Sequence, residues 1–272
     1  MNPVYSTVIG LCLGAFKTMN WKIRVTGTEH VPATGPGVVA TNHVGYLDFI
    51  FAGYGVREQG RRRLRFVAKR EIFDHRVSGP LMRAMRHIPV ERGGDTARML
   101  ADVRAALDEG DLVGMFPEGT ISRSFVPLRG RPGAARMAME AGVPLVPGAV
   151  WGTQRILTKG GSFHATRGAV ITVSFGPPID YDPDEDPVEV TSRLMAAVGE
   201  LVEEAQKSYP QQPSGPDDTW WVPAHLGGTA PTPEEAQRMA QEEADRRRAR
   251  YAGGSGEDGG SGASGSGSDG SS

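Results

Sequence analysis

The sequence is poor in cysteine: Cys12 is the only one among 272 residues. A single cysteine cannot form an intrachain disulfide or a thiolate metal site, and this usage is typical of proteins from a reducing compartment. Hydrophobic residues make up 39% of the chain and charged residues 23%, which is ordinary for a folded protein. The composition therefore excludes a disulfide-stabilised scaffold and favours a folded soluble or peripheral protein.

Long hydrophobic runs are also missing, because no segment reaches the roughly 18 apolar residues expected of a membrane span. The nearest is VYSTVIGLCLGAF at 4–16, which lacks the basic start and cleavage site of a signal peptide. As a helix it would place five apolar residues on one side: Val4, Val8, Leu11, Ala15 and Met19. Two placements stay open: a helix in a membrane interface with Trp21 at headgroup level, or a first helix packed on the domain.

The sequence offers neither a nucleotide-binding glycine pattern nor an obvious covalent nucleophile. No Gly-x-Gly-x-x-Gly and no P-loop follow an expected strand, so nucleotide binding of the usual kind is not supported. Three serines lie outside any Gly-x-Ser-x-Gly setting: Ser78, Ser122 and Ser124. If the protein is an enzyme, the hydroxyl that it activates is therefore expected to belong to a substrate.

What the sequence does contain is an alternation of short apolar segments and amphipathic segments. Strands are expected at 37–42, 64–70, 87–92, 111–119, 143–151 and 169–176. Helices are expected at 48–58, 78–87, 95–109, 133–141 and 187–208. This alternation predicts an α/β fold: a single layered domain with a central, largely parallel or mixed sheet flanked by helices.

We expect four parts along the chain. An N-terminal membrane-interface helix at 1–24 precedes the main domain at 25–210, and a linker with a polar helix follows at 211–251. Residues 252–272 form the fourth part, in which 16 of 21 residues are Gly or Ser. Such a composition cannot bury a core, so a disordered tail is predicted.

Positive charge is concentrated in residues 57–104. This window holds 13 Lys or Arg against six Asp or Glu, a balance of +7, although the whole chain carries −2. A local positive field favours an anionic partner such as a phosphate group, an acidic lipid headgroup or a nucleic acid. Nucleic acid is disfavoured, because only Phe66 lies near the arginines of 57–65 to stack on bases.

The stretch TNHVGYLDFIF at 41–51 carries the most suggestive pair, His43 and Asp48. The strand that ends at Thr41 brings His43 to its carboxyl end, where open α/β sheets place ligands. Gly45 allows a turn, so that Asp48 can reach back to one imidazole nitrogen and leave the other as a base. In the alternative reading, His43 only caps the strand and Asp48 only caps the next helix.

The pair could also belong to a metal site. No third or fourth ligand is evident among the remaining histidines, so no metal is predicted. The other histidines are His30, His75, His87, His164 and His225.

Two further motifs follow expected strands. MFPEGTISRS at 115–124 places the Glu118 carboxylate and the Gly119 backbone at the same edge of the sheet as His43. In IPVERGGD, Arg92 leads through two glycines into a helix N-terminus, which is a favourable place for a phosphate. In the plainer reading, Arg92 is a solvated surface charge.

These motifs together resemble the glycerolipid acyltransferases, the 1-acylglycerol-3-phosphate acyltransferase family. NHVGYLD is similar to the NHxxxxD block of that family, and three later stretches resemble its second, third and fourth blocks in order: HIPVERGG, FPEGTIS and GVPLVPGAV. The resemblance implies transfer of a fatty acyl chain from acyl-CoA or acyl carrier protein to the sn-2 hydroxyl of lysophosphatidic acid. The product would be phosphatidic acid, a precursor in phospholipid biosynthesis.

The resemblance also implies residue roles. His43 would be the general base and Asp48 its orienting partner. The residues implied to bind substrate are Asn42, Lys69, Arg92, Glu118, Gly119, Thr120, Val146 and Pro147. Among them, Arg92, Lys69 and the Glu118–Gly119 pair would serve the acceptor and its phosphate, whereas Val146 and Pro147 would line the acyl side.

One departure from the family pattern is plain: Ile121 stands where arginine often follows Glu-Gly-Thr. Arg123, Arg129 or Arg131 could supply that charge, and the sequence leaves the choice open.

No cofactor or metal is implied beyond the acyl donor as co-substrate. The implied partners are a lysophospholipid acceptor, acyl-CoA or acyl carrier protein, and a membrane surface, with a peripheral or monotopic location on the cytoplasmic face of the plasma membrane. An acyltransferase for another lysophospholipid, or a lipid-binding protein without turnover, remains an alternative.

Overall fold

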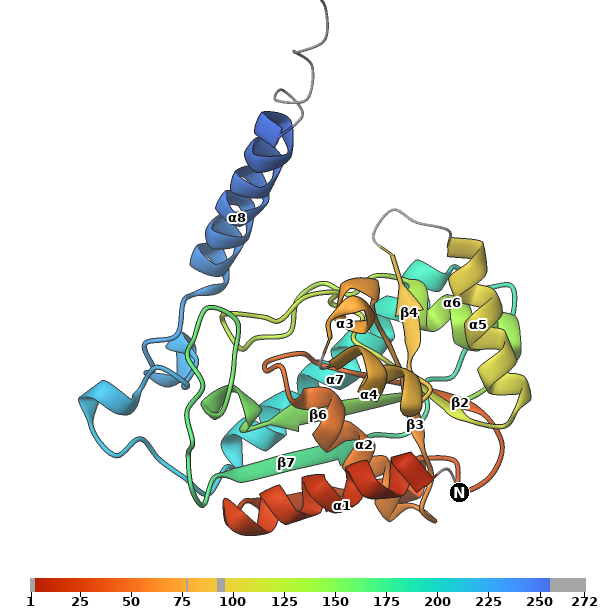
Figure 1. Cartoon of the computed structure of the whole chain (residues 1–272), viewed down its shortest axis with the longest axis horizontal. Coiled ribbons are helices and arrows are strands. Elements are labelled where there is room, and N and C mark those ends of the chain that lie inside the picture. The colour runs from red at the N-terminus through yellow and green to blue at the C-terminus, as the bar shows by residue number, and fades with distance from the viewer. Residues whose placement is uncertain (1–2, 77, 92–95, 255–272) are drawn as a thin grey trace, which may run out of the picture.

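The computed structural model describes residues 3–76, 78–91 and 96–254. These residues form one seven-stranded sheet with the strand order β1-β7-β6-β2-β5-β3-β4 (Figure 1). The strands are β1 (Lys22–Thr26), β2 (Gly37–Thr41), β3 (Leu64–Lys69), β4 (Ile88–Val90), β5 (Leu112–Met115), β6 (Leu145–Trp151) and β7 (Val170–Phe175). Neighbouring strands run parallel except β6 and β7, which are antiparallel. The expectation of a single α/β domain with a largely parallel, mixed sheet is confirmed.

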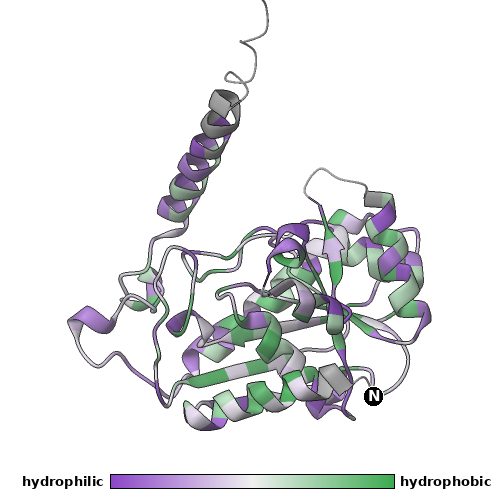
Figure 2. Cartoon of the chain, viewed as in Figure 1, coloured by the Kyte–Doolittle hydropathy of each residue, from purple (hydrophilic) through white to green (hydrophobic). Residues whose placement is uncertain are grey.

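Helices cover both faces of the sheet. They are α1 (Pro3–Thr18), α2 (Asp48–Glu58), α3 (Arg70–Asp74), α4 (Ser78–Ala84), α5 (Thr96–Asp108), α6 (Gly133–Ala141), α7 (Pro187–Lys207) and α8 (Pro233–Gly254). A mostly aliphatic core lies beneath α5, α6 and α7 on one face, and a core richer in aromatic side chains lies beneath α1 and α2 on the other. Strands that lie between two helical layers are buried along their whole length, as in β2 and β6, and Figure 2 shows the hydropathy of these elements.

The sequence did not reveal β1. Its residues alternate between exposed and half-buried positions at the edge of the sheet, so the segment lacks the apolar run that marked the central strands. β1 pairs in parallel with β7, and Arg24 lies opposite Thr172. The domain boundary expected at residue 24 therefore falls inside a strand.

The first helix packs on the domain through its C-terminal half. Phe16 is buried and stacks on Phe51 with ring centroids 5.0 Å apart. Trp21, for which the interfacial placement implied a position at headgroup level, packs against both rings and donates its indole N–H to the carbonyl of Thr166 at 2.9 Å. Leu11, by contrast, is 71% exposed. Within the described ranges, no helix has both the length and the apolar character needed to cross a bilayer.

The segment expected as a linker packs onto the domain. Trp221 and Ala230 are buried, and the Arg155 guanidinium lies 4.3 Å from the centroid of the Trp221 ring. Within the region expected as a linker and polar helix at 211–251, part of the chain thus packs on the domain, because the aromatic side chain of Trp221 buries enough apolar area to hold it. The polar helix is present as α8, which is hydrophilic along its length (Figure 2). The expected tail lies outside the described residues from 255 onward.

The positive window at 57–104 is partly neutralised by acids that lie just beyond it. Arg65 contacts Glu109 and Asp111 at 3.4 Å, and Arg86 donates to Glu109 at 2.8 Å. Extending the window to 111 adds Asp108, Glu109 and Asp111 and reduces the balance from +7 to +4. The positive field is thus weaker than the window alone suggested.

Candidate active site

His43 and Asp48 form a hydrogen-bonded pair at the carboxyl edge of the sheet. The His43 Nδ1 lies 2.8 Å from Asp48 Oδ2, and the imidazole is 17% exposed while the carboxylate is fully buried. Since β2 ends two residues before His43 and α2 starts at Asp48, the intervening turn folds the carboxylate back onto the ring. An imidazole that donates from Nδ1 to a carboxylate carries its lone pair on Nε2 and can act as a base there.

The Asp48 carboxylate also closes the turn between His43 and Asp48. Asp48 Oδ2 also accepts the backbone N–H groups of Val44 at 2.7 Å and Gly45 at 2.9 Å. These amides belong to the turn and not to α2, so the carboxylate serves the turn and the histidine. The alternative in which Asp48 only caps a helix is not supported by this geometry.

The imidazole plane is fixed by stacking. Phe116 lies face to face with His43, with centroids 3.9 Å apart and an interplanar angle of 7°. Phe116 follows β5, which is the direct neighbour of β2 in the sheet. Strand pairing therefore brings the second motif against the first. The sequence contained Phe116 in the third block, but no pattern assigned it this contact.

Glu118 supports the backbone of His43. Its side chain is buried, and its two oxygens accept the N–H groups of His43 at 2.8 Å and Leu128 at 2.9 Å. Burial raises the pKa of Glu118 to about 8, while the two N–H donors act to lower it. We expected Glu118 to contact the acceptor; the structure instead commits both oxygens to holding the loop and the histidine together.

Asn42 likewise has a positioning role. It is fully buried, its Oδ1 accepts from the N–H of Val150 at 2.7 Å, and its Nδ2 donates to the Val150 carbonyl at 3.1 Å. Because these two bonds extend the pairing of β2 and β6 beyond the last strand residue, Asn42 holds the start of the turn. The expected contact of Asn42 with substrate is replaced by this backbone bridge.

Val146 and Pro147 lie inside the sheet. They occupy the second and third positions of β6, opposite Val39 and Ala40 of β2, and both are buried. The expectation that they line the acyl side is not met, because the fourth block is the central strand itself. Its contribution to the site comes from the residues after its carboxyl end.

The loop after β5 places cationic groups beside Gly119 and Thr120. Gly119 has φ +67°, a conformation that favours glycine, and a Cβ at that position would lie 3.4 Å from Arg131 Nε. Lys159 Nζ lies 3.5 Å from Thr120 Oγ1. Of the three arginines left open by the departure at Ile121, Arg131 has its guanidinium against Gly119 of this loop.

Arg123 points to the C-terminal helix instead. Glu243 of α8 lies 3.0 Å from an Arg123 guanidinium nitrogen and 2.9 Å from Lys159 Nζ. One carboxylate thus bridges two cations next to the Thr120 loop. The sequence alone gave no indication that the polar helix would contact this region.

Lys69 is the last residue of β3 and lies half-buried at the carboxyl edge of the parallel strands, which is also the edge that bears His43. It pairs with Val90, the last residue of β4, so the chain that leads to Arg92 leaves the sheet beside Lys69. Arg92 itself lies outside the described residues, and its predicted contact with phosphate stays a prediction.

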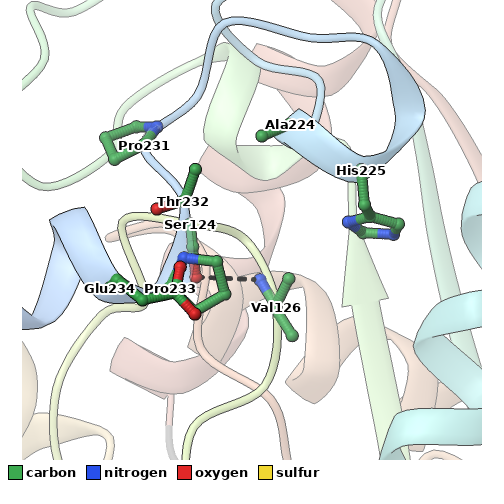
Figure 3. Close-up of a pocket in the computed structure, with 8 residues that line it drawn as sticks. All are labelled: Ser124, Val126, Ala224, His225, Pro231, Thr232, Pro233 and Glu234. Carbon is green, nitrogen blue, oxygen red and sulfur yellow. Dashed lines mark hydrogen bonds between the residues drawn. The ribbon is translucent and has the colours of Figure 1, made fainter.

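A separate cavity of about 470 Å³ lies where the C-terminal segment crosses the loop after β5 (Figure 3). Ser124 and Val126 form one wall, where the N–H of Val126 donates to Ser124 Oγ at 3.4 Å. His225 and Glu234 line opposite sides of it in Figure 3, so they do not form a second acid–base pair. In the part of the chain that the structure describes, no three His, Cys, Asp or Glu side chains gather as metal ligands.

Comparisons with known proteins match the part of the chain that contains this site. The family model described as Acyltransferase matches residues 22–151, which include the His43–Asp48 turn and the Glu118 loop. A 1-acyl-sn-glycerol-3-phosphate acyltransferase from Bacillus subtilis is 31% identical over 144 residues, which cover 52% of this chain and 70% of the relative. A protein of the same name from Limnanthes douglasii is 30% identical over 165 residues, or 59% of this chain and 55% of the relative.

A solved structure shares the fold. The crystal structure of the 1-acyl-sn-glycerophosphate (LPA) acyltransferase PlsC from Thermotoga maritima matches with a TM-score of 0.57 and 23% identity, over 72% of this chain and 77% of that one. The chain thus spans most of the Bacillus protein but only about half of the plant protein. With the motifs, the dyad and these similarities together, the chain belongs to the 1-acyl-sn-glycerol-3-phosphate acyltransferase family.

Proposed function

We propose that this enzyme transfers a fatty acyl chain from acyl-CoA or acyl carrier protein to the sn-2 hydroxyl of lysophosphatidic acid, forming phosphatidic acid in phospholipid biosynthesis. The observation that carries the proposal is the His43–Asp48 pair, in which Nδ1 is bound to a buried carboxylate. A partly exposed imidazole with this partner is suited to take a proton from an alcohol. A protein that only binds lipid would have no use for such a base.

The reaction follows from this geometry. His43 Nε2 removes the proton of the acceptor hydroxyl as the oxygen attacks the thioester carbonyl, and the Asp48 carboxylate stabilises the imidazolium that forms. Collapse of the tetrahedral intermediate breaks the carbon–sulfur bond. The leaving thiolate takes the proton from the imidazolium, which yields an ester and a free thiol and restores the neutral base.

The acceptor phosphate is assigned to the cationic side of the site. Lys69 ends β3 at the edge that carries His43, Arg92 comes two residues after the end of β4 in the sequence, and Arg131 lies against Gly119 beside Thr120. A phosphomonoester bears up to two negative charges, which such groups can pair with directly. Arg92→Ala should raise the acceptor KM and lower kcat/KM by on the order of 10- to 100-fold.

Arg98→Ala, in the exposed first part of α5, is the matched control for Arg92 and should have little effect. Equal losses in the two variants would mean that a diffuse positive field attracts the lipid. An increase in the donor KM alone would indicate that Arg92 binds the acyl donor and not the acceptor phosphate.

We place the enzyme on the cytoplasmic face of the plasma membrane as a peripheral or monotopic protein. The support is a set of exposed apolar side chains: Leu13 on α1 and Leu81 on α4 line one groove, and Leu11 is exposed elsewhere on α1. Exposed apolar residues on a helix favour burial in a bilayer interface. Leu11→Glu combined with Leu13→Glu should lower cosedimentation with phospholipid vesicles, and unchanged cosedimentation would contradict this placement.

The function is tested by incubating purified protein with labelled acyl-CoA or acyl carrier protein and lysophosphatidic acid. Labelled phosphatidic acid is expected, and chelation by EDTA should leave its formation unchanged because no metal is proposed. Lysophosphatidylcholine and lysophosphatidylglycerol serve as matched acceptors. Product from one of these alone would establish the alternative acceptor, and lipid binding without product from any acceptor would overturn the proposal.

A further inference from the structure

A threonine from the loop after β6 reaches the far side of the Asp48 carboxylate. Thr153 Oγ1 donates to Asp48 Oδ1, across 105 residues of sequence. Both side chains are fully buried. While His43, Val44 and Gly45 all contact Oδ2, Thr153 holds the other oxygen, so the two contacts together fix the rotation of the carboxylate.

The position of Thr153 is itself fixed. Gly152 before it has φ +99°, and a Cβ there would lie 2.3 Å from the Val170 carbonyl oxygen, so glycine is required for the chain to turn. The N–H of Gly152 donates to Gln154 Oε1 at 2.8 Å. Arg155 is held by Gln211 at 2.6 Å and by the Trp221 ring. The C-terminal segment therefore anchors the loop that carries Thr153.

The same loop packs against the backbone of the catalytic turn. Thr158 Oγ1 donates to the Val44 carbonyl at 2.7 Å, and the Tyr46 N–H donates to the Leu157 carbonyl at 2.9 Å. A Cβ on Gly45 would lie 3.0 Å from both Thr153 Oγ1 and the Leu157 oxygen. The turn and the loop are thus in direct contact, and a side chain at Gly45 would push them apart.

We infer that Thr153 is a positioning residue for the reaction, because its hydroxyl orients Asp48 and supports the negative charge that holds the His43 tautomer. The inference rests on the proposed acyl transfer. A hydrogen bond donated to a carboxylate stabilises its charged form, and a charged partner makes such a bond stronger than a neutral one. Of the ionisable side chains near it, His43 is hydrogen-bonded to Asp48, and the charge of Asp48 contributes to raising the pKa of Glu118.

The test compares three variants. Thr153→Val keeps the shape and removes the donor, and Thr153→Ser keeps the donor. Thr172→Val is the matched control, since Thr172 Oγ1 in β7 is a buried hydroxyl without a hydrogen-bond partner among the described residues. Thr153→Val should lower kcat by on the order of 10- to 100-fold with both KM values within about twofold of wild type.

Two readouts separate positioning from simple structural support. Loss of the donor should lower kcat while both KM values stay near wild type, whereas a general loss of structure would change both. Thr153→Ser should recover most of the rate, and Thr172→Val should match wild type. An unchanged kcat in Thr153→Val, even with a lower melting temperature, would overturn the inference, as would an equal loss in Thr153→Ser.

A measurement without turnover distinguishes failure of this inference from failure of the proposed function. In ¹⁵N-histidine spectra, Thr153→Val should shift the His43 signals towards a mixture of tautomers, whereas Thr172→Val should leave them in place. If wild type acylates no lysophospholipid, the proposed function fails. If the His43 signals of Thr153→Val equal those of wild type, the positioning role fails whatever the activity.

Discussion

Two regions of the molecule join distant parts of the chain through a carboxylate. One is the turn at residues 43–48 with its buried acids, and the other is the contact that Glu243 of α8 makes with Arg123 and Lys159. Asp48 and Glu118 are 0% and 4% exposed and take N–H and O–H donors from several segments. Glu243 is 32% exposed and holds Arg123 and Lys159 as ion pairs. The partners of Glu243 are 18% and 22% exposed, so solvent still reaches this ion-pair cluster, whereas an unsatisfied group in a fully buried site costs about 1–3 kcal/mol. Substitutions in the turn should therefore affect activity much more than substitutions on α8.

The largest effect is expected for His43→Ala. It should reduce turnover by roughly three orders of magnitude or more, because the base is lost. The melting temperature should change little, since the imidazole is partly exposed and its main contacts are Asp48 and the Phe116 ring. Steady-state rates and a thermal melt check both statements. Near-normal turnover by a well-folded variant would mean that another group removes the proton.

An intermediate effect is expected for Glu118→Gln. The amide can accept from only one of the two N–H groups that Glu118 now binds, so the His43 backbone should shift and kcat should fall by about 10-fold. The same substitution changes the pH dependence of stability, which urea unfolding at several pH values can measure.

The direction in which stability changes with pH follows from the pKa of Glu118, which burial raises from 4.5 to about 8. Between these values the folded state holds more protons than the unfolded state, so the free energy of unfolding decreases as pH rises. Glu118→Gln has no proton to release and should lack this decrease. Parallel stability curves for wild type and variant across this window would show that Glu118 does not titrate in the folded protein.

The smallest effect is expected on α8. Glu243→Gln should change stability by less than about 1 kcal/mol and acceptor KM by less than about threefold, because the amide oxygen can still accept from Arg123 and Lys159, which both retain some exposure to solvent. Glu242→Gln, at the exposed neighbouring position, is the matched control. A loss of kcat in Glu243→Gln comparable to that of Glu118→Gln would remove the distinction between the two regions.

The sequence predicted most of the elements that carry buried apolar runs. The expected helices at 48–58 and 133–141 match α2 and α6 residue for residue, because their ends coincide with turn residues and a clear apolar period. β1 was missed because an edge strand alternates polar and apolar residues. In the region at 211–251, expected to be a linker and a polar helix, proline and glycine favour a linker, yet the buried side chain of Trp221 holds part of the region on the domain.

The site was predictable where chemistry follows local spacing. His43 and Asp48 are five residues apart, and the turn between them could be inferred from Gly45. The support of Asp48 by Thr153 and of His43 by Glu118 depends on strand order, which brings residues 75 and 105 positions apart into contact. Asn42, Val146 and Pro147 were expected to face substrate, but the order of β5, β2 and β6 in the sheet directs them into the interior.

The central claim is that Asp48 holds His43 as a base with its proton on Nδ1, and ¹⁵N spectra of histidine-labelled protein test it most directly. The signals that are present in the wild-type spectrum and absent from that of His43→Gln belong to His43. In wild type near neutral pH, Nδ1 should appear protonated and Nε2 bare, whereas Asp48→Asn should reverse or mix this pattern and lose on the order of 10²- to 10⁴-fold in kcat. A wild-type spectrum with the proton on Nε2, or an Asp48→Asn protein with the wild-type tautomer and rate, would contradict the account.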